Sequence, residues 1–251
     1  MHATAPPCRH NTGVPAPPWR VATHRPLEQL ADGLWQVEAD LQGVPIGRRM
    51  SIVRLASGDL VVNNVIACDA PTMAAIDALG TVRWIVVPSG FHRLDAPAYA
   101  ARYPAAKVVA PAGSAKRISE RCRVDGTLDA LPTDPALRWE ALDGVPAEAV
   151  LVHATSDGAT TLVFNDALMN LPAKLPGLAG FAMGLIGSTG GPKVTPTAKW
   201  FLIRDRPRYA THLRLLAETP GLARVIVAHG ANLTSDAAAA LRSAADQLHR
   251  A

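Results

Sequence analysis

Three short apolar segments of this sequence each run straight into a polar residue. Nearly continuous apolar runs of this kind are typical of strands that are buried on both faces of a sheet. Polar side chains that follow such strands converge at one edge of an α/β sheet, where ligands usually bind. The segments are 82–88, followed by His92, then 160–166, which ends on Asp166, and 224–230, which carries His229.

Further strand and helix patterns alternate along the chain. Ser57-Gly58-Asp59 and Asp157-Gly158 predict two tight turns, each joining a pair of β-rich runs in a hairpin. The order strand, helix, strand, helix favours a layered α/β fold. Strands are predicted at 33–38, 50–55, 60–63, 82–88, 107–110, 149–153, 160–166 and 224–230, and helices at 71–79, 96–103, 111–121, 207–218 and from 234 or 235 to 248.

The composition suits one domain preceded by an arm. Of the 251 residues, 49% are hydrophobic, which is enough for one substantial core. Residues 1–26 hold six prolines and lack the continuous apolar stretch of a signal peptide. We therefore expect a flexible N-terminal arm over 1–26 and a single domain over 27–251.

Charge, hydropathy and cysteine spacing exclude several classes of protein. The formal charge of +4 comes from dispersed basic residues, without the dense basic stripe of a nucleic-acid-binding surface. No run of about 18 apolar residues is present to span a bilayer. The three cysteines, Cys8, Cys68 and Cys122, form no CxxC pair, so neither a zinc ribbon nor a disulfide framework is indicated. We expect a cytoplasmic protein that binds no nucleic acid and has no membrane span.

His92, Asp166 and His229 are the first candidates for chemistry. Neutral imidazole and carboxylate are ordinary ligands of zinc, manganese and iron, so their convergence predicts a metal site. Each residue also has a structural interpretation. His92 and Asp166 are each placed to cap a following segment, and His229 to bond the backbone of its own turn. His153 is either a further ligand or an ordinary histidine at the end of a hairpin strand.

The segment 171–197 differs from the rest of the chain. It is apolar, rich in glycine and interrupted by prolines. Three interpretations fit this composition: a lid over a site, an oligomer contact in a homodimer, or a packed insertion. Its stretch 187–193 lacks the GxxxxGK[ST] spacing, which excludes a phosphate-binding loop of that type.

Three stretches of the sequence are similar to the metallo-β-lactamase superfamily. They are the strand 82–87 with the turn that holds His92, then Phe164-Asn165-Asp166, then Val227-Ala228-His229-Gly230. The resemblance extends from about Gly33 to Leu248. It implies an α/β fold of the metallo-β-lactamase type, an αββα sandwich of two mixed sheets covered by helices.

The resemblance also implies a set of metal ligands. The superfamily motif His-x-His-x-Asp-His falls on Gly90, His92, Leu94 and Asp95, so only His92 matches and Asp95 stands where a histidine is expected. The bridging aspartate falls on Asp166 and the last histidine on His229. The remaining histidine is expected near residue 145, where there is none, and His153 is the alternative. The implied ligands are His92, Asp95, His153, Asp166 and His229.

A closer resemblance is to one branch of that superfamily, the DUF4336 family. Members often carry a second histidine directly after the first, where this chain has Arg93. The resemblance favours a role for His153. The matching stretches are Pro88-Ser89-Gly90-Phe91-His92, His153-Ala154-Thr155-Ser156, 161–166, 187–192 and Ala228-His229-Gly230.

Two hypotheses of function follow. The first is a metal-dependent hydrolase of unknown substrate with a reduced ligand set, in which zinc is favoured over iron or manganese. Asp166 is then also the catalytic residue that orients water or acts as general base, and Arg93 and Lys193 are candidates to hold an anionic substrate. The second is a catalytically inactive scaffold that binds a metal or a small ligand, or binds no metal if the site is degenerate.

Overall fold

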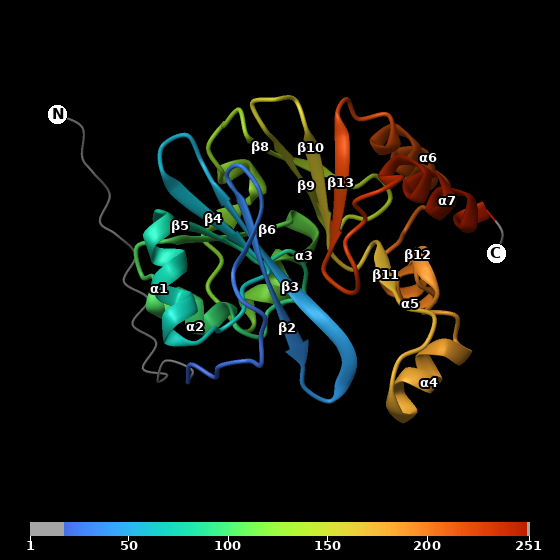
Figure 1. Ribbon diagram of the computed structural model, residues 1–251, viewed down its shortest axis with the longest axis horizontal. Coiled ribbons are helices and arrows are strands. Elements are labelled where there is room, and N and C mark those ends of the chain that lie inside the picture. The colour runs from blue at the N-terminus through green and yellow to red at the C-terminus, as the bar shows by residue number, and fades with distance from the viewer. Residues whose placement is uncertain (1–17, 250–251) are drawn as a thin grey trace.

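The computed structural model describes residues 18–249. Two β-sheets face each other at the centre, and helices cover the outer face of each (Figure 1). This arrangement confirms the predicted αββα sandwich of two mixed sheets. Each predicted hairpin, strand and helix listed above has a counterpart in the structure, with ends that differ by a few residues.

The larger sheet has seven strands in the order in which they occur along the chain. Its first four strands are antiparallel, and β4 to β7 are parallel. The turn between β3 and β4 depends on Gly58, whose φ of +84° is strained for other residues. The strands are β1 (Glu28–Ala31), β2 (Leu34–Leu41), β3 (Val44–Arg54), β4 (Asp59–Asn63), β5 (Thr81–Val86), β6 (Lys107–Ala110) and β7 (Gly126–Thr127).

The smaller sheet has four strands in the order β13-β10-β9-β8. β10 and β13 are parallel, whereas β8 and β9 run antiparallel to their neighbours. The carboxyl ends of β10 and β13 therefore lie at one edge, and the carboxyl end of β9 lies at the opposite edge. The strands are β8 (Leu137–Ala141), β9 (Ala149–Ala154), β10 (Thr160–Phe164) and β13 (Leu222–Val227).

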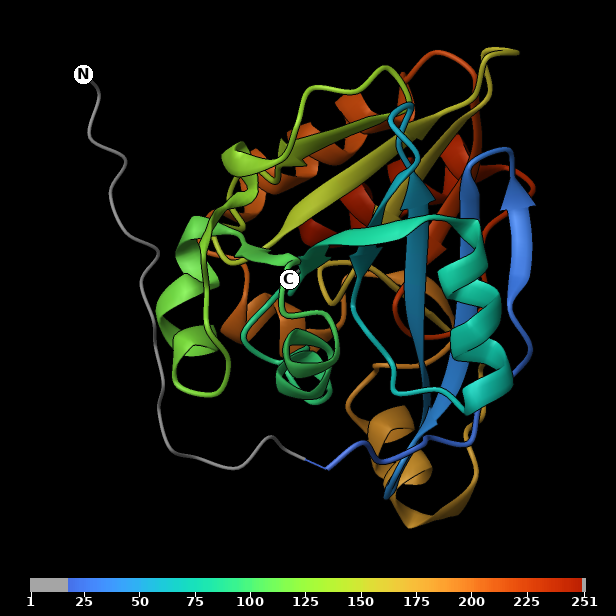
Figure 2. The same cartoon turned by 90° about the vertical axis from the view of Figure 1, so that its left-hand side faces the viewer.

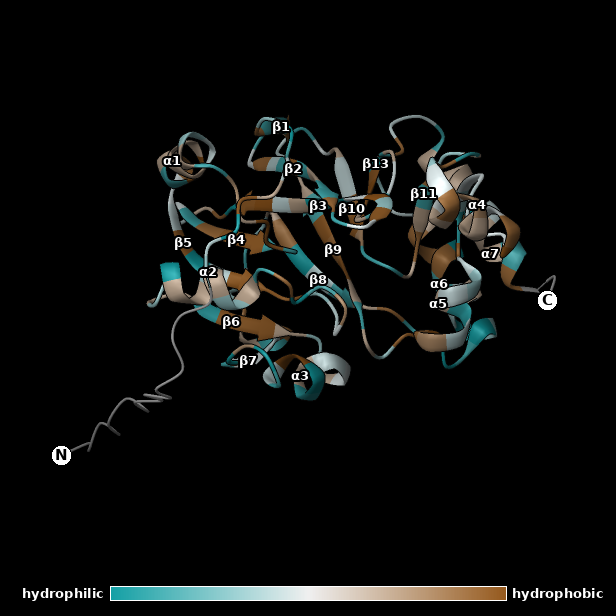
Figure 3. Cartoon of the chain, turned by 90° about the horizontal axis from the view of Figure 1, so that it is seen from below, coloured by the Kyte–Doolittle hydropathy of each residue, from teal (hydrophilic) through white to brown (hydrophobic). Residues whose placement is uncertain are grey.

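Three apolar layers hold the sandwich together. The central layer contains buried side chains from both sheets, among them Val61, Leu151 and Val163. A second layer lies under α1 (Ala70–Leu79), α2 (Ala96–Arg102) and α3 (Ala112–Ser119) on the outside of the larger sheet. The third lies under α6 (Arg206–Ala217) and α7 (Ala237–His249) on the outside of the smaller sheet. Figure 2 shows the two sheets between these helices, and Figure 3 shows apolar strands such as β4, β6 and β9 in the interior.

Most of the predicted arm, residues 1–17, lies outside the described residues. Residues 18–26 lie against the larger sheet and the segment before α1. Trp19 donates its indole N–H to the carbonyl of Cys68, and the backbone N–H of Arg25 binds the carbonyl of Glu38. The boundary between arm and domain stays a prediction. In the described part of the chain, no helix has the length and hydropathy needed to cross a membrane.

The segment 171–197 forms a subdomain at one end of the molecule. β11 (Met169–Leu171) pairs with β12 (Gly191–Lys193), α4 (Gly177–Leu185) lies between them in sequence, and α5 (Pro196–Phe201) follows. α4 projects from the body on the same side as the tip of the β2–β3 hairpin (Figures 1 and 2). Its large apolar side chains are solvent-exposed, with Leu178 at 88%. This exposure is confined to α4 and its C-terminal end, because Leu171, Ser188 and Val194 of the same segment are buried, so the lid, the dimer contact and the packed insertion all stay predictions.

Candidate metal centre

Four parallel strands end at the same edge of the sandwich, and a polar residue follows each. Asn64 follows β4, His92 lies in the loop after β5, Asp166 follows β10 and His229 follows β13. The strand ends place these side chains close together because parallel strands share the direction of their carboxyl ends. The sequence analysis identified all of them except Asn64.

The two histidines meet on one oxygen of Asp166. Its Oδ1 lies 3.0 Å from His92 Nε2 and 3.1 Å from His229 Nε2. The two imidazole rings are tilted by 36°, with their centroids 5.3 Å apart. One candidate ligand atom from each of the three residues lies within 4.8 Å of the other two. This is the ligand group predicted from the strand ends.

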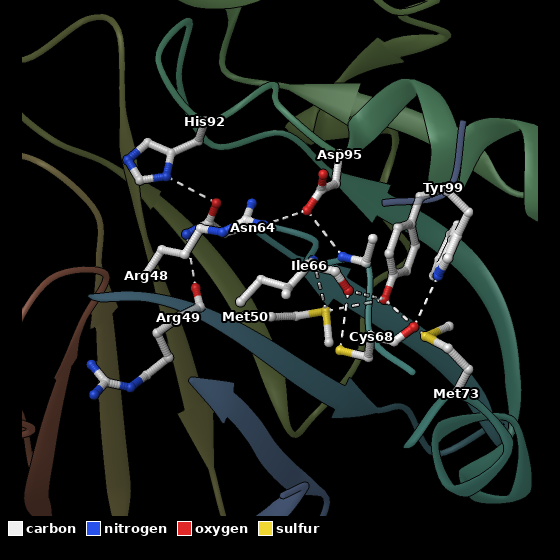
Figure 4. A network of polar contacts seen from close by, with 12 residues as sticks. Arg48, Arg49, Met50, Asn64, Ile66, Cys68, Met73, His92, Asp95 and Tyr99 are labelled. Carbon is white, nitrogen blue, oxygen red and sulfur yellow. Dashed lines mark hydrogen bonds and ion pairs between the residues drawn. The ribbon is translucent and has the colours of Figure 1, made fainter. Parts of the chain in front are cut away.

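Asn64 fixes the orientation of the His92 ring. Its amide nitrogen donates to the carbonyl of Arg49 at 2.8 Å, so its oxygen faces His92 Nδ1 at 2.9 Å (Figure 4). Asn64 has a left-handed backbone conformation with φ of 56°, which asparagine tolerates better than most residues. A polar residue at the end of β4 was the sequence signal that could have found it.

The ring of His229 is held by backbone instead of a side chain. Its Nδ1 lies 2.6 Å from the carbonyl oxygen of Gly47 on β3. Arg49 braces the same turn, because its guanidinium donates to the carbonyls of Val227 and Gly230 and pairs with Glu38. His229 thus binds backbone, as predicted, but on β3 and not in its own turn, and its second ring nitrogen is left directed at Asp166.

These partners determine what the Nε2 atoms offer. Both Nδ1 atoms face oxygens that only accept hydrogen bonds, so Nδ1 carries the proton in each neutral ring. Each neutral ring then directs an Nε2 lone pair at a carboxylate oxygen, and such an arrangement of acceptors needs a proton or a metal cation between them. Metal-binding histidines are usually held through their other nitrogen in this way. The donor set therefore fits a divalent cation.

Charge shifts the pKa values of this group. Burial alone would raise the pKa of the Asp166 carboxyl, but the charges and hydrogen bonds of His92 and His229 lower it well below its usual range. Burial lowers the pKa of His229, and the hydrogen bond and charge of Asp166 outweigh burial and raise it. Asp166 thus stays a carboxylate at neutral pH.

Glu148, a buried acid that the sequence analysis missed, binds the backbone at Asp166. The Glu148 carboxylate accepts the backbone N–H of Asp166 at 3.2 Å and that of Ala167 at 2.9 Å. Burial, and then the charge of Asp166, raise the pKa of Glu148 well above its usual value. Glu148 lies 18 positions before Asp166, close to where the superfamily pattern places its remaining histidine, and directly before β9.

Asp95 was predicted as a ligand and is not brought to the group. Its Oδ2 is 2.6 Å from Arg48 Nη2 and accepts the backbone N–H of Ala67 at 3.0 Å (Figure 4). Both side chains of the Arg48–Asp95 pair are buried. Asp95 differs from the prediction because Arg48, on β3, forms an ion pair with its carboxylate and neutralises its charge.

His153 was also predicted as a ligand and lies elsewhere. β9 pairs His153 with Thr161, five positions before Asp166 along β10, which is about 16 Å at a normal strand rise. The carboxyl end of β9 points away from the site because β9 is antiparallel to β10. Burial lowers the pKa of His153, and Asp32 is the first opposing charge.

The two basic residues proposed for the rim both have partners. Arg93 donates to the carbonyl of Arg117 and to the carboxylate of Glu120, and Lys193 donates to the carbonyls of Thr189 and Gly187. They hold loops in place, so the geometry gives no support to their role as substrate anchors.

No family model matches the sequence, and no curated protein matches it either. Solved structures do match. The metallo-β-lactamase FIM-1 from Pseudomonas aeruginosa, in its mono-zinc form, has a TM-score of 0.57 and 13% identity, over 90% of this chain and 96% of its own. This chain has the metallo-β-lactamase fold. The metallo-β-lactamase DIM-1, exposed to ceftazidime, has a TM-score of 0.61 and 12% identity, over 91% and 99% of the two chains.

A metallo-β-lactamase from Hirschia baltica gives a similar result, with a TM-score of 0.58 and 12% identity over 88% of this chain and 98% of its own. At these identities the likeness establishes the metallo-β-lactamase fold and nothing finer. The closer resemblance to the DUF4336 family stays a prediction.

Proposed function

We propose that this protein is a metal-dependent hydrolase, with one divalent ion held by His92, Asp166 and His229. The observation that carries the proposal is the convergence of two Nε2 lone pairs on Asp166 Oδ1, with both Nδ1 atoms bonded to fixed oxygens. Three protein ligands with a position left open are the usual form of a catalytic zinc site. A bound ion would supply Lewis acidity and make hydroxide available near neutral pH.

Zinc is the metal we favour, and iron is the main alternative that the donor set allows. Two histidines and one carboxylate are also the ligands of non-haem iron sites. Asp166 would hold the ion and orient water, since a general base works best with a pKa near the operating pH and the pKa of Asp166 is lowered. The free, buried thiols of Cys68 and Cys122 support the prediction of a reducing, cytoplasmic setting.

The second candidate function is an inactive scaffold that binds a metal or a small ligand. The closed pair of Arg48 and Asp95 favours it, because a position of the superfamily's metal motif is used here for structure. Gly90 and Leu94, at two other motif positions, carry no ligand atom in their side chains. The two functions differ in turnover and not in fold.

Elemental analysis of untagged protein, purified without chelator, tests the proposal. We expect near-stoichiometric zinc or iron that is lost in His92→Ala/His229→Ala. The matched control is His153→Gln, another buried histidine, which should retain the metal. The metal-loaded protein is then screened on ester, thioester, amide and phosphodiester substrates.

The outcomes separate the two functions. Turnover that disappears on metal removal and in the double variant supports the hydrolase. Bound metal without turnover on any substrate favours the scaffold. Folded wild-type protein that takes up no metal, even from added zinc or iron, contradicts the metal centre itself.

A further inference from the structure

A cavity of about 370 Å³ lies directly beside the candidate metal centre. Its volume is at the lower end of the range for small-molecule sites. Asp166 forms part of its wall, so a ligand in this cavity would lie against the same carboxylate that both histidines contact. The other lining residues are Phe91, Arg117, Met169, Thr197, Ala198, Phe201 and Leu202.

Apolar side chains dominate the wall and are partly open to solvent. Phe91, in the loop after β5, is 51% exposed. Phe201, at the end of α5, is 61% exposed. Leu202 and Ala198 are buried beneath them. Large apolar surfaces at the mouth of a cavity mark ligand sites more often than ordinary protein surface. The wall therefore fits an apolar group of the ligand.

Arg117 gives the cavity a fixed positive charge. Its guanidinium carbon lies 4.3 Å from the centre of the Phe91 ring, a cation–π geometry. Its stem packs on Gly90, where an added Cβ would lie 2.5 Å from Arg117 Cδ. Arg93 donates to its backbone carbonyl. Within residues 18–249 no carboxylate forms an ion pair with Arg117. Its charge acts on the Phe91 ring and, at longer range, on Glu120, so it is not neutralised by direct contact.

We propose that this cavity binds a small aliphatic monoanion. The alkyl chain would lie between Phe91, Phe201 and Leu202, and the anionic group would bind the guanidinium of Arg117. The inference rests on the proposed function only in taking such a molecule for part of the substrate or a product. The cavity itself is formed by residues outside the metal ligands, apart from Asp166.

Calorimetric titration of metal-free protein tests the binding without depending on the metal. The probes are hexanoate, octanoate and decanoate below their aggregation limits, with 1-octanol as the neutral counterpart of octanoate. Affinity should rise about fourfold for each added methylene until the cavity is filled. Octanoate should bind at least about tenfold more tightly than 1-octanol, since a charged hydrogen bond at Arg117 is absent from the alcohol.

Two pairs of variants locate the binding. Arg117→Gln should abolish the preference for octanoate over 1-octanol, whereas Lys116→Gln, an exposed neighbour outside the cavity, should keep it. Phe201→Ala should weaken octanoate about tenfold, in line with the loss of a large apolar contact. Phe181→Ala on α4, with a similarly exposed ring at 65%, should have no effect. Far-UV circular dichroism checks that every variant is folded.

Three results would overturn the inference: no binding of any alkanoate, equal binding of octanoate by Arg117→Gln, or equal weakening by Phe181→Ala and Phe201→Ala. The last would show that α4 and not the cavity collects apolar molecules. Because the protein is metal-free in these titrations, a failed metal analysis leaves the result unchanged. Arg117→Gln should also keep the metal content of the wild type. Loss of alkanoate binding in this variant would then leave the metal centre unaffected.

Discussion

Two aspartates of this protein, Asp95 and Asp166, are buried to the same extent and have different partners. Each is 9% exposed. Asp95 binds Arg48 and a backbone N–H through one oxygen, whereas Asp166 meets two imidazoles through one oxygen. Sequence alone predicted both as metal ligands. The comparison shows that the partner, and not the burial of the carboxylate, separates a structural ion pair from a candidate ligand.

The difference between the partners is one of charge. An arginine guanidinium keeps its charge at any pH that a folded protein meets, so its carboxylate is neutralised permanently. An imidazole can be neutral, and it then offers a lone pair to a metal ion. The charge of Asp95 is therefore already neutralised by Arg48, whereas Asp166 keeps the surroundings expected of the metal ligand that we propose. The predictions below test this distinction.

The largest effect is expected from Asp95→Ala. It leaves the buried guanidinium of Arg48 without a counter-charge, which should lower the free energy of unfolding by about 3–5 kcal/mol. Urea denaturation of metal-free protein measures the change. The double variant Arg48→Met/Asp95→Ala should recover most of the loss, because it removes both charges and keeps an apolar stem. A loss below about 1 kcal/mol would show a pair screened like those on protein surfaces.

A smaller effect on metal binding is expected from Asn64→Gly. It removes the oxygen that holds His92 Nδ1 and retains the left-handed backbone, so metal affinity should fall about 10–100-fold. Competition with a chromogenic chelator measures the affinity. Asn64→Asp keeps an acceptor for His92 and should bind metal at least as well as the wild type. Equal affinities for the glycine variant and the wild type would mean that His92 is not a ligand.

The elements of the site that sequence predicted share one property. His92, Asp166 and His229 follow parallel strands, and an apolar run followed by a polar residue is a local pattern. The layered α/β class was predicted for the same reason, since alternating strand and helix patterns are local too, whereas the αββα sandwich was implied by the resemblance to the metallo-β-lactamase superfamily. Asn64 also follows an apolar run, at the end of β4. It was missed because its segment was interpreted only as one strand of a hairpin.

The remaining differences have two sources. The predicted hairpin around Asp157-Gly158 already makes β9 antiparallel to β10, which places His153 at the far edge, but the family resemblance favoured His153. Glu148 was missed because a single acid before a strand carries no local signal of the backbone N–H groups that it binds. Asp95 finds its partner 47 positions earlier in the chain, on β3. No local sequence pattern around Asp95 or Arg48 predicts this contact, because side-chain partners that are distant in sequence are determined by packing.

A third effect distinguishes the two aspartates by pH. The pKa of His229 is raised above the ordinary 6.5 of histidine by Asp166, so the folded metal-free protein binds more protons than the unfolded chain above that value. Stability from this pair is complete below about pH 6.5 and is lost as the pH rises through the raised pKa. The lowered pKa of Asp166 predicts a separate loss as the pH falls below 3.8.

Urea unfolding from about pH 6 to about pH 9 checks the alkaline loss. Asp166→Asn should make the curve shallower, because burial without the carboxylate lowers the pKa of His229, while the buried Glu148 keeps a slope of its own. Asp95→Ala should shift the curve down without changing its slope in this range, since its partner is an arginine. An unchanged slope in Asp166→Asn would assign the proton to a group other than His229.

The smallest net effect is expected from Glu148→Gln, which extends the comparison to an acid that forms no ion pair with any of residues 18–249. Among the described residues, only the backbone N–H groups of Asp166 and Ala167 donate to Glu148, and burial and the charge of Asp166 raise its pKa. A raised pKa in an acid means that the folded state holds its proton longer. Stability should therefore fall as the pH rises from 4.5 through the folded value.

Glutamine removes this pH dependence and loses one hydrogen bond, since its amide nitrogen cannot accept. We expect Glu148→Gln to be about 1 kcal/mol less stable than the wild type near pH 5 and to match or exceed it near pH 8. Urea unfolding of both metal-free proteins at the two pH values measures the crossover. A variant that loses more at pH 8 than at pH 5 would show that the ionised form of Glu148 stabilises the fold. The different effects of replacing Asp95, Asp166 and Glu148 on stability would then have a cause other than their cationic partners.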